Sequence, residues 1–175
     1  MNSSLTKAVN RLLEWTLILL MGASVLNVLW QVFTRFVIQN PSSYTEEMAR
    51  FLLIWVGLLA AAYGVGTRSH LAIDLLPMKL EGRRRQWLEI GIQVSVFVFA
   101  LFIMVIGGFR LVTTMLYLQQ SSAALGLKLG YVYLVLPISG ILILYYATMH
   151  ILDARRGMIR SDTTVVQDDK SHPID

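Results

Sequence analysis

The chain has 175 residues, of which 55% are hydrophobic and only 15% are charged, whereas roughly a quarter of the residues in soluble domains are charged. Its net charge is +4 and it contains no cysteine, which excludes disulfide bonds, thiolate metal sites and cysteine nucleophiles. The basic residues cluster beside apolar runs, a pattern typical of membrane orientation rather than of nucleic-acid binding. We therefore expect an all-α membrane protein that binds no nucleic acid.

Four apolar runs follow one another along the chain, and each is long enough for a transmembrane helix. The first predicted span covers about residues 13–35. It carries a polar stripe that should face other helices rather than lipid; the stripe consists of Ser24, Asn27, Gln31 and Thr34. The second covers about residues 44–68 and begins with a capping box formed by Ser43 and Glu46. Its small residues have the spacing of a close helix contact: Gly57, Ala60, Ala61 and Gly64.

The third predicted span, residues 86–118, is long enough to be strongly tilted or to project beyond the bilayer. Arg110 near its end can reach the interface by extending its side chain along the helix. The fourth predicted span, residues 130–152, contains Pro137, which should kink the helix. We expect residues 1–155 to form one four-helix domain and residues 156–175 to form a polar, mostly disordered tail.

The distribution of basic residues predicts the orientation in the membrane. If the N-terminus is cytoplasmic, the outer side carries only four of the 15 basic residues, and the other eleven lie inside. The four on the outer side are Arg35, Arg50, Arg110 and Lys128. Because the number of spans is even, both termini are expected in the cytoplasm.

Charged residues gather at the start of the second span. Glu46 lies four residues before Arg50 and Glu47 lies three before it, so all three can share one flank of a helix with the acids preceding the base, an order that favours ion pairing. Two interpretations stay open: an interfacial cap with a surface ion pair, or a polar clamp on Arg35 or on a partner subunit. We do not expect a proton-carrying or catalytic pair, since no histidine or metal ligand accompanies these carboxylates.

Alternative functions have weaker support in the sequence. His70 and His150 fall at the inner ends of their spans, and two facing histidines can ligate a haem in a four-helix bundle; both positions also suit ordinary interfacial histidines. His70 and Asp74, with Arg68 before them, are better explained as anchors of the loop after the second span.

A free-standing small exporter would need a carboxylate inside its first span, but Glu14 precedes the apolar run. The sequence contains no combination of nucleophile, base and oxyanion hole and no glycine-rich phosphate loop. We therefore expect neither an enzyme nor a cofactor nor a metal site.

Three motifs together resemble the small membrane subunit of tripartite ATP-independent periplasmic (TRAP) transporters, the DctQ-like family. They are YTEEMAR at residues 44–50 followed by Trp55 and Gly57, RSHLAID at residues 68–74, and GYVYLVLPISG at residues 130–140, which contains Tyr133 and Pro137. They occur in the family's order and spacing. One departure is Tyr44, where the family more often has tryptophan; an aromatic interfacial anchor is retained.

The resemblance implies a non-catalytic scaffold subunit of a sodium-dependent importer of organic acids in the bacterial inner membrane. A large DctM-like membrane subunit would carry the substrate and sodium sites and move like an elevator. A periplasmic binding protein would deliver an acid such as a C4-dicarboxylate or sialic acid, and this chain could help it to dock. Membrane lipids would surround the complex. The expected structural cluster is Arg35, Glu46, Glu47 and Arg50, and the expected interface or loop anchors are Tyr44, Trp55, Arg68, His70, Asp74, Tyr133 and Pro137.

Overall fold

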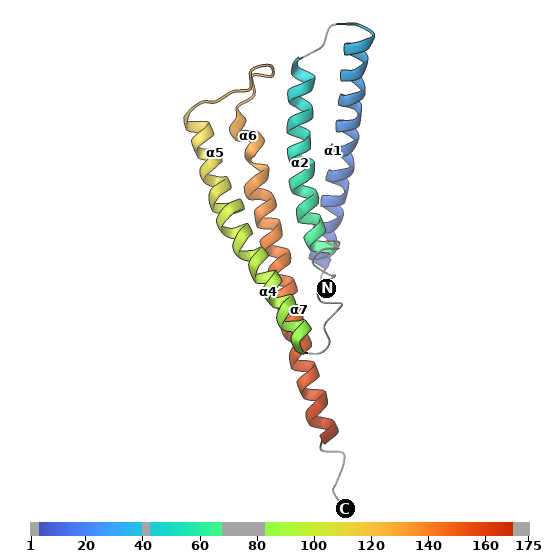
Figure 1. The fold of residues 1–175 in the computed structure, drawn as a ribbon, viewed down its shortest axis with the longest axis vertical. Coiled ribbons are helices and arrows are strands. Elements are labelled where there is room, and N and C mark those ends of the chain that lie inside the picture. Colours follow the sequence, from blue (N-terminus) through green and yellow to red (C-terminus); the bar gives the residue numbers. More distant parts are fainter. Residues whose placement is uncertain (1–3, 40–42, 68–82, 170–175) are drawn as a thin grey trace, which may run out of the picture.

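The computed structural model describes residues 4–39, 43–67 and 83–169, and these segments are helical apart from short connections (Figure 1). Among them, four helices are long and apolar enough to cross a membrane: Thr6–Phe36, Ser43–Thr67, Ile90–Tyr117 and Leu129–Asp153. The predicted all-α fold with four spans is therefore confirmed.

The helices form two antiparallel pairs (Figure 1). The first pair consists of α1 (Ser4–Phe36) and α2 (Ser43–Thr67). In the second pair a continuous rod packs against α6 (Leu129–Tyr133) and α7 (Val135–Asp169). The rod consists of α4 (Arg83–Phe99), the π-helix η2 (Ala100–Gly107) and α5 (Gly108–Tyr117). Because α2 also packs against α7, it joins the two pairs.

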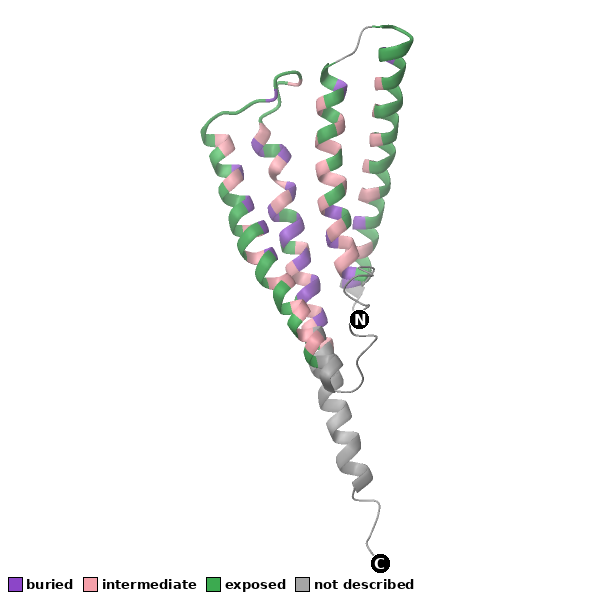
Figure 2. Ribbon diagram, in the orientation of Figure 1, coloured by how far each residue is buried: buried purple, intermediate pink, exposed green. Residues whose placement is uncertain are grey.

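The pairs converge at the end where α1 begins and diverge at the other end (Figure 1). We call these the closed end and the open end. The open end carries the end of α1, the start of α2 and the loop between α5 and α6. Buried residues are concentrated on α7 and on the facing sides of its neighbours, whereas most of α1 is exposed (Figure 2). The interior of the fold therefore lies around α7.

Three helices are held together near the closed end by one buried tyrosine. The ring of Tyr146 in α7 is fully buried and lies against Gly66 of α2, where an added Cβ would stand 2.7 Å from the ring. Its hydroxyl donates a hydrogen bond to Asn10 Oδ1 of α1 at 2.5 Å. One turn further along α7, His150 Nε2 donates to the carbonyl oxygen of Val65 at 3.0 Å. That carbonyl belongs to the last turn of α2, where the helix itself supplies no donor.

Of the small residues predicted to make a close helix contact, Gly57 makes none with the described part of this chain. Nothing lies within 4 Å of a Cβ added at Gly57. The close approach of α2 to its neighbours uses Ala62, which is fully buried, and Gly66. The spacing of small residues indicated that one face of α2 could approach another helix closely. The position of the Tyr146 ring determines that the glycine required for this approach is Gly66.

The C-terminal part of the chain differs from expectation. The sequence predicts a mostly disordered tail from residue 156, but α7 continues as a helix to Asp169. Between residues 154 and 169 the chain has one glycine and no proline, so no residue in this stretch strongly terminates a helix. Residues 156–169 are therefore a continuation of α7 in the structure.

The contact between Gly66 and Tyr146 can be tested with a matched pair of glycine substitutions. Gly66→Ala should destabilise the protein by about 1–3 kcal/mol, because the added methyl group overlaps a ring that burial and the Asn10 bond hold in place. Gly57→Ala should be neutral or slightly stabilising, since alanine favours a helix over glycine and the site is open. The measurement is the thermal unfolding midpoint in detergent, and equal effects of the two substitutions would contradict the packing described.

Candidate functional site: a polar contact between the helix pairs

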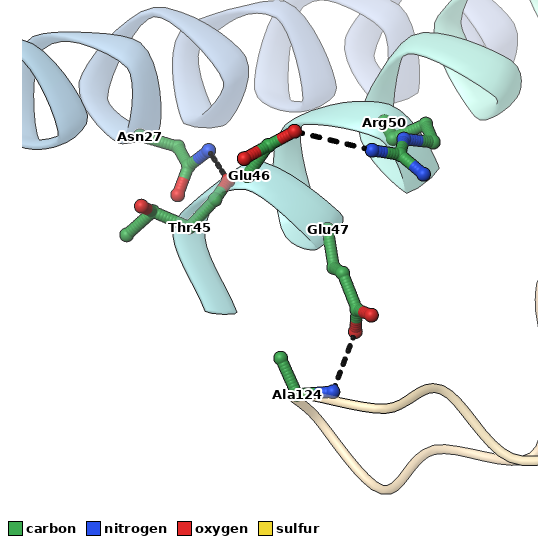
Figure 3. A network of polar contacts seen from close by, with 6 residues as sticks. All are labelled: Asn27, Thr45, Glu46, Glu47, Arg50 and Ala124. Carbon is green, nitrogen blue, oxygen red and sulfur yellow. Dashed lines mark hydrogen bonds and ion pairs between the residues drawn. The ribbon is translucent and has the colours of Figure 1, made fainter. Parts of the chain in front are cut away.

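Glu47 near the start of α2 connects the two helix pairs at the open end. Its carboxylate accepts hydrogen bonds from the hydroxyl of Ser122 and from the backbone N–H groups of Ala124 and Leu125, the last two at 3.2 and 3.3 Å (Figure 3 shows Glu47 and Ala124). Hydrogen bonds to an ionised acceptor are among the stronger ones in proteins. A single carboxylate therefore fixes the loop between α5 and α6 to the start of α2.

The loop that receives Glu47 is itself ordered by short-range hydrogen bonds. The N–H of Ser122 donates to the carbonyl of Leu127 at 2.8 Å, and the N–H of Gly126 donates back to Ser122 at 3.0 Å. Gly126 has a φ of 65°, in the left-handed region that glycine adopts without strain. This tight turn directs the N–H groups of residues 124 and 125 to the same side, where the carboxylate lies.

Glu46 and Arg50 form the ion pair that their spacing predicts. Arg50 Nη2 lies 3.3 Å from Glu46 Oε1, and the two side chains are 65% and 66% exposed (Figure 3). Exposed pairs of this kind contribute little to stability. Of the two interpretations left open by the sequence, the surface ion pair thus describes Glu46 and Arg50, while Glu47 makes a separate contact.

The structure does not bring Arg35 to these carboxylates. Its guanidinium lies 5.9 Å from the centre of the Phe36 ring, and among the described side chains it forms no ion pair with Glu46 or Glu47. The contact between α1 and α2 is made instead by Asn27, whose side-chain amide donates to the carbonyl of Thr45 at 2.8 Å (Figure 3). The polar stripe of α1 therefore faces α2, as predicted.

Trp55 provides a second connection between the pairs, halfway along α2. Its indole Nε1–H donates to the carbonyl oxygen of Val132 at 3.0 Å. This carbonyl lies at the break between α6 and α7, one turn before Pro137. Proline lacks an N–H and its ring clashes with the preceding turn, which explains the predicted interruption of the fourth span at this point. In a membrane, backbone groups beside a helix interruption need partners in neighbouring helices, and Trp55 supplies one to Val132.

The other residues expected as anchors lie as follows. Tyr44 is 47% exposed, as an interfacial side chain would be, and Tyr133 is half-buried. Arg68, His70 and Asp74 lie outside the described residues. Of the two histidines considered for haem, only His150 is described, and its ring is buried and bonded to a backbone carbonyl. Among the described residues, no three His, Cys, Asp or Glu side chains are grouped as in a metal site.

Sequence reasoning identified Glu47 but not its partners. Ser122 is 75 residues away, in a connection that the sequence describes only as polar and rich in small residues. The pair of Asn10 and Tyr146, separated by 136 residues, was also missed. The available signal was that each is a polar side chain inside or beside an apolar run, and such a side chain needs a partner.

The role of Glu47 can be separated from that of its exposed neighbour. Glu47→Gln replaces an ionised acceptor of three hydrogen bonds by a neutral amide, so the backbone amides of residues 124 and 125 should exchange their hydrogens several-fold faster. Glu46→Gln should leave these amides unchanged, because the ion pair of Glu46 among the described residues is with Arg50. Hydrogen exchange measured by mass spectrometry gives the result, and identical protection in both variants would contradict the connection.

The contact of Trp55 can be tested with a second tryptophan as its control. Trp55→Phe keeps an aromatic ring but removes the donor to Val132, which should lower the free energy of unfolding by about 1–2 kcal/mol. Trp30→Phe should cost less, since Trp30 is half exposed and stacks on Phe33. Unfolding in mixed micelles of increasing denaturing detergent measures both, and a smaller loss in Trp55→Phe would show that this hydrogen bond is unimportant.

Comparisons with known proteins agree with this architecture. Residues 24–157 match the family described as the DctQ component of tripartite ATP-independent periplasmic transporters. The chain is 31% identical over 103 residues to the sialic acid TRAP transporter small permease protein SiaQ of Vibrio cholerae, which covers 59% of this chain and 60% of that protein. It is 30% identical over 105 residues to the C4-dicarboxylate TRAP transporter small permease protein DctQ of Rhodobacter capsulatus, 58% of this chain and 44% of the relative.

A longer relative matches over more of the chain. The sialic acid TRAP transporter permease protein SiaT of Haemophilus influenzae is 27% identical over 139 residues, which are 79% of this chain but only 22% of that protein. The chain thus spans 60% or less of each of these relatives. The family match over residues 24–157, together with four membrane-spanning helices, shows that this chain belongs to the DctQ family, as a multi-pass small permease subunit of a TRAP transporter.

Proposed function

We propose that this chain is a non-catalytic scaffold subunit of a sodium-dependent importer of organic acids in the bacterial inner membrane. The observation that supports this most directly is the use made of its polar side chains. Each of five polar side chains forms a hydrogen bond with a helix or loop other than its own. They are Asn27, Glu47, Trp55, Tyr146 and His150. Side chains engaged in this way hold helices at fixed positions and are not available to a moving solute.

The partner in this proposal is a large DctM-like membrane subunit. In the SiaT relative, the segment similar to this chain is 22% of a much longer permease, which supports a permanent association between such a segment and further membrane-spanning parts. The surface of the chain suits a membrane neighbour, because large apolar side chains are exposed along α1 and along η2 and α5. Phe102, Ile103, Ile106 and Phe109 belong to the second of these faces.

The distribution of basic residues favours a cytoplasmic N-terminus, and this orientation turns the open end toward a periplasmic binding protein. With a cytoplasmic N-terminus, the open end is periplasmic and carries Glu46, Arg50 and Lys128 as exposed charges. A periplasmic binding protein would then meet the part of the chain that Glu47 holds in place. The relatives named for sialic acid and for C4-dicarboxylates support an acid of one of these two classes as the transported solute.

Reconstitution tests the scaffold role. The large subunit with this chain and the binding protein should take up the acid in a sodium-dependent manner, whereas this chain alone in liposomes should transport nothing. Glu47→Ala should reduce the yield of the assembled complex and the uptake rate several-fold, because the loop between α5 and α6 loses its attachment. Glu46→Ala serves as the matched control and should change both much less.

Two results would overturn the proposal. Uptake by the isolated chain would make it a transporter in its own right. Full uptake by the large subunit in the absence of this chain would show that transport does not require a scaffold subunit. Solute binding by the isolated binding protein should be the same in every case, which separates an assembly defect from a change in substrate recognition.

A further inference from the structure

A basic groove lies on α1 at the closed end, on the side that faces away from the other helices. It has a volume of about 600 Å³. Its described lining residues all belong to the first turns of α1: Lys7, Ala8, Arg11, Leu12 and Trp15. The opposite side of the same turns faces α7, where Thr6 and Asn10 bond to Tyr145 and Tyr146. The described lining of the groove therefore lies on the side of α1 opposite to its contact with α7.

Among the described side chains, the two cations in the groove have no anionic partner. Lys7 and Arg11 are four residues apart, so their charges lie on successive turns of one helix face, an arrangement that is destabilising for like charges. The nearest acid in sequence is Glu14, which flanks the same face, but no ion pair joins it to either cation among the described side chains. Both cations remain exposed and are available to an external anion.

An aromatic and apolar surface continues directly from the cations toward the middle of the membrane span. Trp15 is 61% exposed and Leu12 is 70% exposed. One turn later, Ile18 and Leu19 are also exposed, by 55% and 69%. Tryptophan is enriched at the level of lipid headgroups, with basic residues outside it and aliphatic residues inside it. From Lys7 to Trp15 the helix rises about 12 Å, so this sequence of side chains covers the change from headgroup to hydrocarbon.

We propose that Lys7, Arg11 and Trp15 form a binding site for one anionic phospholipid. The phosphate-bearing headgroup would lie between the two cations, and an acyl chain would follow Leu12 and Leu19. The site requires only that α1 begins at a membrane surface, so it is independent of the transported solute. A free phosphate ion would use only the cations, and the exposed apolar surface beside them favours a lipid as the occupant.

Native mass spectrometry of the full chain in detergent tests the proposal. Phosphatidylglycerol and phosphatidylcholine with the same acyl chains are added separately, and the number of lipids retained is measured. We expect phosphatidylglycerol to be retained preferentially, and K7Q/R11Q to weaken its binding about tenfold. The charge-matched control R110Q/K128Q removes two exposed cations elsewhere in the chain and should keep the preference.

Further outcomes keep the test decisive if K7Q/R11Q proves unstable. Glu14→Gln removes the acid beside the two cations and should strengthen retention of phosphatidylglycerol. Equal retention of the two lipids by the unmodified chain, an undiminished preference in folded K7Q/R11Q, or no gain in Glu14→Gln would overturn the site. Complete displacement of phosphatidylglycerol by inorganic phosphate would show a small-anion site instead and would also overturn it.

Discussion

The structure depends on partners for backbone groups that no helix satisfies. Inside a bilayer there is no water to bond an exposed carbonyl or N–H group, so each such group must find a partner within the protein. Two interhelical contacts of this chain meet that need, and a third satisfies N–H groups of the loop at the open end. Val65 near the end of α2 bonds to His150, Val132 at the break before Pro137 bonds to Trp55, and the turn at residues 124–125 bonds to Glu47. The same contacts that satisfy the backbone also connect the helices.

Helix α2 supplies one side of all three contacts, which makes it the central element of the fold. Glu47, Trp55 and Val65 are distributed along it from the open end to the closed end. The 18 residues from the first to the last correspond to a rise of about 27 Å, close to the thickness of the hydrocarbon core. The second helix pair is therefore attached to α2 near both of its ends and near the middle. An attachment at only one level would allow the pairs to pivot, and attachment at three levels restricts that motion.

The sequence predicts features that depend on neighbouring residues better than features that depend on distant ones. The four spans, the interruption at Pro137 and the direction of the polar stripe around Asn27 follow from hydropathy and helical spacing, and the structure confirms them. The partner of Glu47 could not be found in this way, because Ser122 approaches only after two helix pairs have packed. The choice between Gly57 and Gly66 likewise depends on where α7 places Tyr146. Arg35 was expected as a partner of the acids within the chain, but it is Asn27 that bonds to α2.

The first helix depends on polar contacts more than its hydrophobic composition suggests. In its most apolar stretch only 6% of the residues are buried, compared with 39% in the fourth span. In water such a helix would be held by the hydrophobic effect, but lipid is as apolar as a neighbouring helix, so that driving force is absent in a bilayer. Packing against α2 and a few hydrogen bonds must then position α1. These are the bonds of Thr6 and Asn10 to the tyrosines of α7 at one end and of Asn27 to α2 toward the other. Polar residues inside an otherwise apolar span thus determine where the helix lies, although they contribute least to its insertion.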